Sequence, residues 1–415
     1  MSRPTLLGVV ALALLCLLAY GPLLHLPLIE DDYPSLAQAQ ALGGPHDLPA
    51  LFHNTVFRVR ATSVWCMYWL WKAFHLTPAA YHGLSLLLHI LNTWLVFAIA
   101  SAWPGTRKGA FWAAAFFAVQ EGHQEAVMWF TAINELWMFV FGAAALWFGV
   151  LRGRRLLGLT LFFFALISKE SAVIFLPLFW LVVPDWRRLV PYAALAAVVT
   201  GSIFLTRDAS FRFSDGSFSL HAPFWITWPK GVARVLWIWG WIAGVWIAVR
   251  GDAKQRASAA RAVAWIAIAL IPYIFLTYST QIPSRQTYLA TVGLSLLVGL
   301  GASCIKASRE INELGGVRGA TCTVVVAAVV LAHNVGVLWI RKRAQFLERA
   351  APTERLIALA RTAGGPIWVQ CFPRTDWIAK EAVHLATGRP ASDLVWSESE
   401  ARERGAVAVF CYRPK

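Results

Sequence analysis

The sequence predicts an all-α polytopic membrane protein, with about eleven transmembrane helices and a small C-terminal α/β extracytoplasmic domain. Three observations predict this fold class. Hydrophobic residues make up 58% of the 415 residues and charged residues only 14%, a composition that one soluble core could not bury. Apolar runs recur along residues 1–340, separated by short basic segments. Residues 341–415 are instead of mixed polarity and form the predicted second domain.

The apolar runs define the expected membrane spans. A helix needs roughly 20 apolar residues to cross a bilayer, and fewer where it packs inside a bundle. The first run follows only Arg3 and lacks a convincing small-residue cleavage site, so it reads as a retained helix and not as a signal peptide. The eleven expected spans are residues 6–26, 80–103, 109–119, 136–151, 156–167, 172–183, 189–205, 223–249, 263–278, 288–305 and 320–340.

The basic residues predict how these spans are oriented. The net charge of +15 does not indicate nucleic-acid binding, because Lys and Arg lie mainly between apolar runs, as in membrane proteins that face anionic lipid. Segments that can all be cytoplasmic are 107–108, 152–155, 187–188, 250–261 and 306–318. The opposite, outer face then holds the first outer loop 27–79 and the segments 120–135, 168–170, 206–222 and 281–287.

The C-terminal segment reads as a small α/β unit. Arg341-Lys342-Arg343 begins a tail that this topology places outside the cytoplasm, followed by a helix 344–362, a strand 367–372, a helix 376–387 and a strand 406–412. Cys371 and Cys411 fall near the ends of the two strands, and a disulfide between them is possible if their Cα atoms lie close enough. The cysteines expected in the apolar core are Cys16, Cys66, Cys304 and Cys322.

Adjacent acids follow the first apolar run, namely Glu30, Asp31 and Asp32. Keeping all of them ionised beside a membrane is unfavourable unless cations or a metal ion lie near. A carboxylate held there with a shifted pKa can accept a proton from an acceptor hydroxyl. The alternative interpretation is an ordinary helix end solvated by lipid headgroups.

Further polar residues fall on the expected outer face. His123 and Glu125 could bind an acceptor or a metal ion, but their spacing does not suit one helical face, so no metal site is assigned and a divalent metal stays an open alternative. Lys169 and Glu170 either neutralise each other at a helix junction or face a functional cavity. Arg285 precedes a span, where its planar guanidinium suits a lipid phosphate.

Two histidines, His82 and His89, are seven residues apart in the second span and share a helix face. Alone, such residues are more often satisfied bundle residues than ligands. We therefore expect His89 to stabilise packing through a hydrogen bond.

An ordered set of short stretches resembles the signatures of the GT-C glycosyltransferase superfamily, in its protein O-mannosyltransferase-like branch that includes the membrane part of the TMTC proteins. Each stretch is weak alone, whereas the ordered set, covering roughly residues 5 to 300, is fairly specific. The stretches are EDDY (30–33), FRVRATS (57–63), YHGLSLLLH (81–89), GHQEAVMW (122–129), SKES (168–171) and SRQTYL (284–289).

The resemblance implies an enzyme that takes a sugar from a dolichyl- or undecaprenyl-linked donor on the extracytoplasmic face and inverts the anomeric carbon. It implies Asp31 as the base and Asp32 as its neighbour for orientation or acceptor binding. The residues expected to face the donor phosphate are Lys169, Arg285 and, more weakly, Arg60. The expected acceptor-side or auxiliary residues are Glu30, His123, Glu125, Glu170 and Tyr288.

The sequence departs from the family pattern at three points. Ala61 follows Arg60 where the family usually has Pro, Gln120-Glu121 replaces the usual His-Pro, and Gln286-Thr287 interrupts the aromatic pair around Arg285. These departures affect the expected role of Arg60 and the acceptor site more than that of the base.

The main hypothesis is therefore a multi-pass glycosyltransferase of the bacterial inner membrane with a periplasmic active site. Its partners would be a polyprenyl-phosphate sugar donor, a protein or glycolipid acceptor and membrane lipid, with no nucleic acid. A secondary transporter or flippase of a lipid-linked sugar is the first alternative, although it predicts inverted repeats and mid-span charges that are not evident. A non-catalytic membrane protein that binds a lipid-linked sugar is the second.

Overall fold

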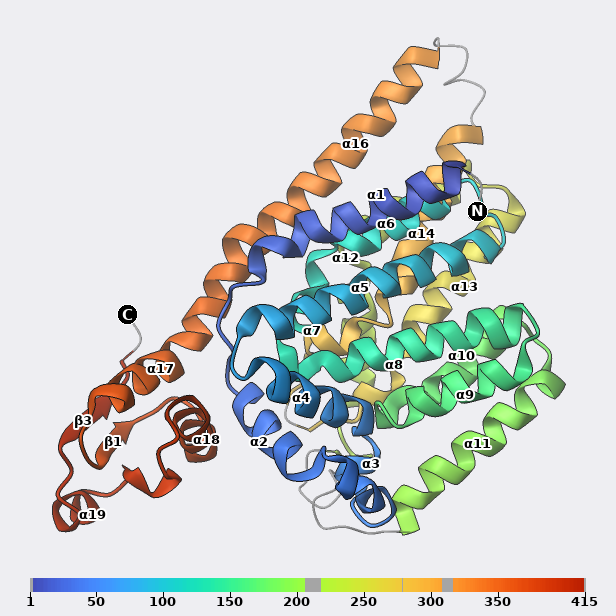
Figure 1. Ribbon diagram of the computed structural model, residues 1–415. Helices are drawn as coiled ribbons and strands as arrows, with labels where there is room; N and C mark the ends of the chain where they lie inside the picture. The colour runs from blue at the N-terminus through green and yellow to red at the C-terminus, as the bar shows by residue number, and fades with distance from the viewer. Residues whose placement is uncertain (1–2, 206–217, 278, 308–315, 414–415) are drawn as a thin grey trace.

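The computed structural model describes residues 3–205, 218–277, 279–307 and 316–413. Most of the expected outer segment 206–222 and of the basic stretch 306–318 lies outside these residues. Helices form a bundle with a C-terminal segment at one end (Figure 1). The bundle contains α1 (Arg3–Tyr20), α5 (Pro78–Ala102), α6 (Ala110–Val119), α8 (Ile133–Ala144), α9 (Arg155–Leu166), α10 (Phe175–Val182), α11 (Trp186–Leu205), α12 (Phe224–Arg250), α13 (Ala253–Leu270), α14 (Thr291–Ala307) and α16 (Gly316–Gly336).

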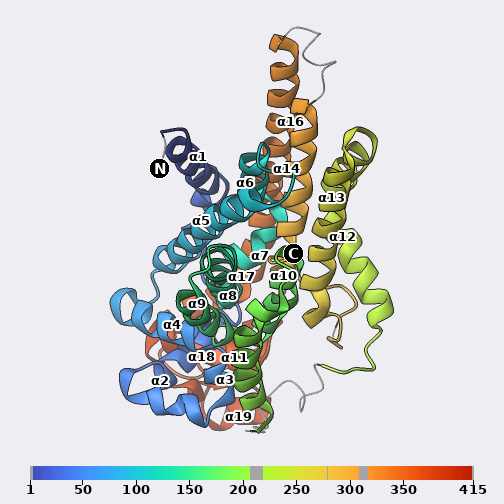
Figure 2. The ribbon, with the colours of Figure 1, turned by 90° about the vertical axis from the view of Figure 1, so that its right-hand side faces the viewer.

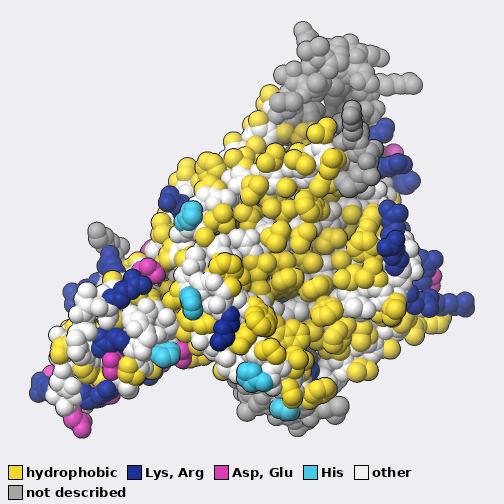
Figure 3. Space-filling model, viewed as in Figure 1, with side chains coloured by type: hydrophobic (Ala, Val, Ile, Leu, Met, Phe, Trp, Pro, Cys, Tyr) yellow, Lys and Arg dark blue, Asp and Glu magenta, His cyan; other side chains and the backbone are white. Residues whose placement is uncertain are grey.

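Among the described residues, five helical segments are long and apolar enough to cross a membrane: Leu6–Leu23, Pro78–Ala102, Phe130–Leu151, Phe224–Arg250 and Val325–Thr362. Shorter apolar helices accompany them, as the short runs in the sequence predict. A broad hydrophobic face covers the bundle between two more polar ends (Figure 3). Lys and Arg side chains line the end that lies away from the C-terminal segment.

Small residues allow close helix packing inside the bundle. A Cβ atom added to Gly109, just before α6, would lie 1.9 Å from the carbonyl oxygen of Gly299 in α14. A second close approach joins Gly149 to Gly158 in α9, beneath the ring of Tyr192. Glycine at these positions lets the backbones approach as they do in membrane helix pairs.

One predicted span begins well before its expected position. The prediction placed it at residues 263–278, but α13 begins at Ala253 and ends at Leu270. Asp252 caps this helix, because its side chain accepts a hydrogen bond from the Gln255 N–H, and the Gln255 side chain accepts one from the Asp252 N–H. The basic stretch 250–261 is therefore mostly helix and not a connecting loop.

The span predicted to end at residue 340 and the helix predicted to begin at residue 344 are continuous. The helix α16 continues through a π-helical turn, Val337–Lys342, into α17 (Arg343–Thr362), and the two form one long rod along the bundle (Figure 1). Residues 337–349 contain no Gly or Pro, so nothing local interrupts the helix where the charges begin. This rod carries the chain from the bundle into the C-terminal segment.

Three helices form the outer segment between α1 and α5. They are α2 (Asp32–Leu42), α3 (Thr55–Arg58) and α4 (Ala61–Phe74), with a 3-10 segment, Pro45–Phe52, before α3. The helix α2 packs against both α4 and α18 (Asp376–Thr387), so the outer and C-terminal segments meet at the same end of the bundle (Figure 2).

The C-terminal segment contains a three-stranded parallel sheet of order β2-β1-β3. Its strands are β1 (Ile367–Cys371), β2 (Leu394–Val395) and β3 (Ala408–Cys411), and its helices are α17, α18 and α19 (Glu398–Glu403). The predicted strands and helices have counterparts here, whereas β2 and α19 were not predicted. Cys371 and Cys411 form a disulfide with their Cα atoms 4.5 Å apart, which confirms the pairing that the sequence left open.

The other cysteines are free where they are described. Cys16 and Cys304 are buried, as predicted, and Cys66 is partly buried. The side chain of Cys322 lies outside the described part of the chain.

Candidate active site

Glu30 joins the first outer segment to the C-terminal segment. Its carboxylate accepts hydrogen bonds from Arg349 of α17, at 2.5 Å from Nη2 and 3.1 Å from Nε, and lies 2.6 Å from Nη2 of Arg374. The Glu30 backbone has a φ of 46°, which is unusual for a residue with a Cβ atom. Such a conformation persists where the surroundings hold it, and the paired arginines are part of those surroundings.

Asp32, two residues later, is fully buried. Its carboxylate accepts hydrogen bonds from the Ile29 N–H at 2.8 Å and from the N–H and hydroxyl of Thr131, both at 2.7 Å. Burial raises the pKa of Asp32 to about 7, although these hydrogen bonds act in the opposite direction. The acid therefore anchors the start of α2 to the segment before α8.

Asp31 has a different environment from both neighbours. Its side chain is exposed, and among the described residues its carboxylate makes no hydrogen bond or ion pair. Protein around it still displaces water, and this desolvation, followed by the charge of Glu30, raises the pKa of Asp31. The positive charges of Arg285, Arg349 and Arg374 oppose that rise. Asp31 thus offers an available carboxylate on which the charges of several arginines act.

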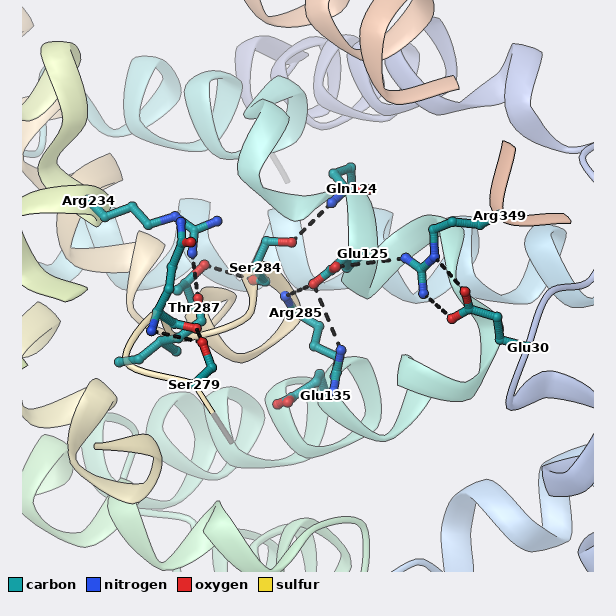
Figure 4. A network of polar contacts seen from close by, with 12 residues as sticks. Glu30, Gln124, Glu125, Glu135, Arg234, Ser279, Ser284, Arg285, Thr287 and Arg349 are labelled. Atoms are coloured by element: carbon teal, nitrogen blue, oxygen red, sulfur yellow. Dashed lines mark hydrogen bonds and ion pairs between the residues drawn. The ribbon is translucent and has the colours of Figure 1, made fainter. Parts of the chain in front are cut away.

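Glu125 lies between two of these cations, Arg285 and Arg349 (Figure 4), and both also contact Trp129. The short helix α7 (Gln124–Met128) carries Glu125, whose carboxylate lies 4.0 Å from Nη1 of Arg285 and 3.9 Å from Nη1 of Arg349. The guanidinium carbons of Arg285 and Arg349 lie 4.7 Å and 4.5 Å from the centre of the Trp129 ring. Two guanidinium groups therefore share one carboxylate and one indole.

Hydrogen bonds fix the loop that carries Arg285. Glu125 accepts a hydrogen bond from the Arg285 N–H at 3.1 Å, and Gln124 donates one to the Ser284 hydroxyl at 3.0 Å (Figure 4). Burial disfavours the charged form of Glu125, but bonds from Ser284 and Arg285 and the nearby arginine charges together lower its pKa. Glu125 is consequently an ionised residue that positions Arg285.

Lys169 and Glu170 do not neutralise each other. Lys169 pairs instead with Glu135 of α8, is only 5% exposed, and lies 4.9 Å from the centre of the Tyr273 ring. Burial lowers the pKa of Lys169 to about 8, although the Glu135 charge opposes this shift. A phosphate role for Lys169 would require its pair with Glu135 to open.

Arg60 likewise has a carboxylate partner. Its guanidinium binds Glu170 through both terminal nitrogens, at 2.8 Å from Nη1 and 3.0 Å from Nη2. The charge of Arg60 also acts on Lys169, so the two ion pairs form one cluster. This second cluster contains Arg60, Lys169 and Glu170 but none of the acids at residues 30–32.

His123 and Tyr288 lie in a buried aromatic group beneath these clusters. The Nε2 atom of His123 is 2.6 Å from the Thr291 hydroxyl, and burial lowers the pKa of His123 well below its usual range. The Tyr288 hydroxyl is 2.7 Å from Nδ1 of His89, which confirms the expected packing hydrogen bond of His89. Neither His123 nor Tyr288 is exposed, so the structure gives them no direct surface on which to hold an acceptor.

Some residues of the site were not predicted. Arg349 and Arg374 belong to no motif. Glu135 ends the polar outer segment 120–135 but was assigned no role there. Within the described ranges, no group of three or more His, Cys, Asp or Glu side chains is arranged to hold a metal ion.

Comparisons with known proteins bear on the fold. No protein-family model matches the chain. A stretch of 52 residues is 44% identical to the protein O-mannosyl-transferase Tmtc1 of Drosophila melanogaster, covering 12% of this chain and only 6% of that protein.

The solved structures cover almost the whole chain. ArnT from Cupriavidus metallidurans in the apo state has a TM-score of 0.56 at 14% identity, over 98% of this chain and 90% of ArnT. ArnT bound to undecaprenyl phosphate gives 0.53 at 13% identity, over 97% and 91%. An Archaeoglobus fulgidus oligosaccharyltransferase tethered with an acceptor peptide gives 0.52 at 10% identity, over 95% of this chain and 64% of that one.

Identities this low establish the fold and leave the activity to be argued from the site. The fold agrees with the resemblance found in the sequence motifs, and the apolar helices agree with a membrane location. The chain is a multi-pass membrane protein with the GT-C fold of ArnT and the oligosaccharyltransferase.

Proposed function

We propose that this protein is a membrane glycosyltransferase that moves a sugar from a polyprenyl-phosphate donor to an acceptor hydroxyl, with inversion. The observation that carries the proposal is the exposed Asp31 carboxylate, whose pKa the charge of Arg285 lowers. An acceptor base and a cation for a departing phosphate are the groups that this transfer needs. The GT-C fold supports the same reaction class.

In the proposed reaction, Asp31 takes the proton of the acceptor hydroxyl. The acceptor oxygen forms a bond to the anomeric carbon while the bond from that carbon to the phosphate oxygen breaks. The polyprenyl phosphate leaves with the electron pair, and attack opposite the leaving group inverts the anomeric carbon. Arg285 stabilises the charge that develops on the phosphate. The leaving group is already good, so positioning supplies much of the rate enhancement.

The remaining residues support these two in the proposal. Asp32 holds the start of α2, and with it Asp31, through its bonds to Thr131, and Glu125 fixes Arg285 by accepting its N–H. The ion pairs of Lys169 with Glu135 and of Arg60 with Glu170 form the second cluster described above. His123 and Tyr288 act through packing beneath the site.

We place the reaction on the periplasmic side of a bacterial inner membrane crossed by about eleven helices. The disulfide of the C-terminal segment supports an oxidising compartment at that end, because disulfides persist in such compartments. The Lys and Arg side chains at the other end of the bundle support a cytoplasmic location there (Figure 3). The transferred group would be a hexose or a pentose, and the acceptor a protein or glycolipid hydroxyl.

Transfer by purified protein tests the proposal. A polyprenyl-phosphate sugar with a labelled sugar is supplied together with candidate acceptors, and the product anomer is determined by NMR. Asp31→Asn should lower turnover by about a hundredfold or more, as loss of a general base does. Asp376→Asn, at an exposed ion pair of α18, is the control and should keep wild-type turnover.

Wild-type turnover in the Asp31→Asn variant would disprove the assigned chemistry. Two other outcomes separate the alternatives. Flux of the lipid-linked sugar across proteoliposomes without covalent transfer indicates a flippase. Donor binding that never leads to turnover indicates a non-catalytic lipid-sugar-binding protein.

A further inference from the structure

The long C-terminal helix brings an arginine to the place where Arg285 lies. The guanidinium of Arg349 lies 4.5 Å from the centre of the Trp129 ring, and that of Arg285 lies 4.7 Å from the same centre. Both side chains are 27% exposed, so each reaches solvent while resting on protein. Trp129 and Glu125 thus hold the two arginines at one partly open position, where Figure 4 shows Glu125 between them.

Charge at this position is unevenly distributed. Glu125 can neutralise one guanidinium, and at 3.9 Å and 4.0 Å it lies at the outer limit of an ion pair with each. Two like charges around one carboxylate attract a further anion. In this structure that anion is Glu30, which binds Arg349 through both of its carboxylate oxygens.

The geometry of the contact between Glu30 and Arg349 also suits a phosphate. A guanidinium donates two parallel hydrogen bonds to a phosphate as readily as to a carboxylate. Glu30 uses this donor pair of Arg349 from a backbone with φ of 46°, a conformation that needs support. Glu30 also keeps a second cation, Arg374, at 2.6 Å, so it would stay paired if Arg349 were withdrawn.

We propose that Arg349 is a second phosphate-binding residue of the site, and that Glu30 occupies its guanidinium until the donor phosphate displaces it. The phosphate would then bind between Arg285 and Arg349, while Glu30 remains with Arg374. This inference rests on the proposed function for the identity of the phosphate. It makes the C-terminal segment part of the donor site, because Arg349 and Arg374 both lie in that segment.

A purely structural role is the competing explanation, in which Arg349 only fastens α17 to the outer segment. The chain offers a control for that role. Lys342, seven residues earlier on the same rod, lies 3.9 Å from Glu121 and makes a longer bridge to the outer loops. Among the described residues, Trp129 makes cation–π contacts with Arg285 and Arg349 and not with Lys342.

Binding measured without turnover tests the inference. The full chain is placed in lipid nanodiscs, and binding of undecaprenyl phosphate is titrated for wild type and variants, with undecaprenol and inorganic phosphate as parallel probes. Arg349→Gln should weaken binding of undecaprenyl phosphate about tenfold, the loss expected for one charge-assisted contact. Arg349→Lys, which keeps the charge but not the paired donors, should recover part of the affinity.

Glu30→Gln separates the two explanations by the sign of its effect. If Glu30 competes with the phosphate, its removal should strengthen binding about threefold or more, because Arg349 is then available in a larger fraction of molecules. If the pair is only structural, Glu30→Gln and Arg349→Gln should weaken binding equally and lower the melting temperature together. Glu121→Gln and Lys342→Gln should leave the affinity unchanged.

The probes identify what is recognised. Inorganic phosphate that competes with undecaprenyl phosphate in wild type but less in Arg349→Gln supports recognition of the phosphate itself. Undecaprenol that binds as tightly as undecaprenyl phosphate overturns it. If Arg285→Gln abolishes binding while Arg349→Gln does not change it, this inference fails and the proposed function stands. If wild type neither binds nor transfers, both fail.

Discussion

Asp32 and Thr131 are joined by two hydrogen bonds of 2.7 Å, one from the Thr131 N–H and one from its hydroxyl. The contact ties the first outer segment to the 3-10 turn that leads into α8. Because Asp32 is fully buried, few other groups can replace these donors. Asp32 is therefore an anchor for the neighbouring Asp31 and not a second available base.

The first prediction concerns this anchor. Thr131→Val keeps the shape and the backbone N–H but removes the hydroxyl donor, and should lower the free energy of unfolding by about 1–2 kcal/mol. Asp32→Ala leaves several buried donors without a partner and should lower it by about 3 kcal/mol or more. Thermal unfolding in detergent measures both changes. Thr131→Ser, which keeps the hydroxyl, should stay close to wild type, and an equal loss in Thr131→Ser and Thr131→Val would contradict the assignment.

The second prediction concerns how Asp32 makes stability depend on pH. Its pKa is raised from 3.8 to about 7, so between these values the folded state binds a proton that the unfolded state has released. Stability should therefore fall as pH rises from about 4 to about 7, by up to about 4 kcal/mol, and stay level above it. The measurement is the difference in melting temperature between wild type and Asp32→Asn across this range. A difference that does not change with pH would contradict the raised pKa.

The third prediction concerns Asp31 as the base. Turnover should fall at acidic pH, where Asp31 takes up a proton. The charges around Asp31 set the pH at which this acidic limb of the profile falls. The Glu30 charge raises the pKa of Asp31, so Glu30→Gln should move the limb to lower pH. The Arg374 charge lowers it, so Arg374→Gln should move the limb to higher pH. The pH dependence of kcat/KM, which reports the free enzyme, measures both, and shifts in the same direction would exclude Asp31 as the titrating base.

The residues alone do not divide the roles of Asp31 and Asp32, and only the family resemblance implied Asp31 as the base. Adjacent acids look alike in sequence, and what separates them is the direction in which the start of α2 turns each side chain. Asp32 turns toward Thr131, which lies 99 residues further along the chain. Arg349 was missed for a related reason, because 319 residues separate it from Glu30 and nothing local marks the pairing.

The fold class could be predicted from the sequence more readily than the site. Apolar runs show directly which segments form helices of a bundle, since few other structures can bury so many apolar residues. The same pattern located the polar turn that carries Lys169 and Glu170. It could not predict their ion-pair partners, because Glu135 and Arg60 approach only when α8 and the start of α4 pack against this turn. The start of α13 was predicted too late, because its N-cap at Asp252 is a weaker signal in the sequence than the apolar run that begins at residue 263.

The fourth prediction concerns the C-terminal segment. The Cys371–Cys411 disulfide closes a loop across 40 residues, and removal of such a constraint should destabilise the segment by about 4 kcal/mol. The variant with Cys371→Ser and Cys411→Ser should therefore be cleaved faster by protease within residues 363–413, while the bundle remains resistant. Limited proteolysis followed by mass spectrometry measures the sites. Cys66→Ser is the control, because Cys66 is free, and equal resistance of the disulfide variant would contradict a stabilising role.

The fifth prediction concerns the buried pair of Lys169 and Glu135. Both side chains are at most 6% exposed, so Glu135→Gln leaves an ammonium group without its counter-charge and should lower the free energy of unfolding by about 3–5 kcal/mol. Replacing both partners, with Lys169→Met and Glu135→Leu, should restore much of that loss, because neither charge is then buried. The exposed pair of Arg188 and Asp185 is the control, and Asp185→Asn should change stability by less than about 1 kcal/mol. Thermal unfolding of wild type, Lys169→Met, Glu135→Leu and the double variant forms a double-mutant cycle. Additive losses in that cycle would show that Lys169 and Glu135 have no interaction energy. The ammonium group of Lys169 would then be available for the phosphate role that the family resemblance implies.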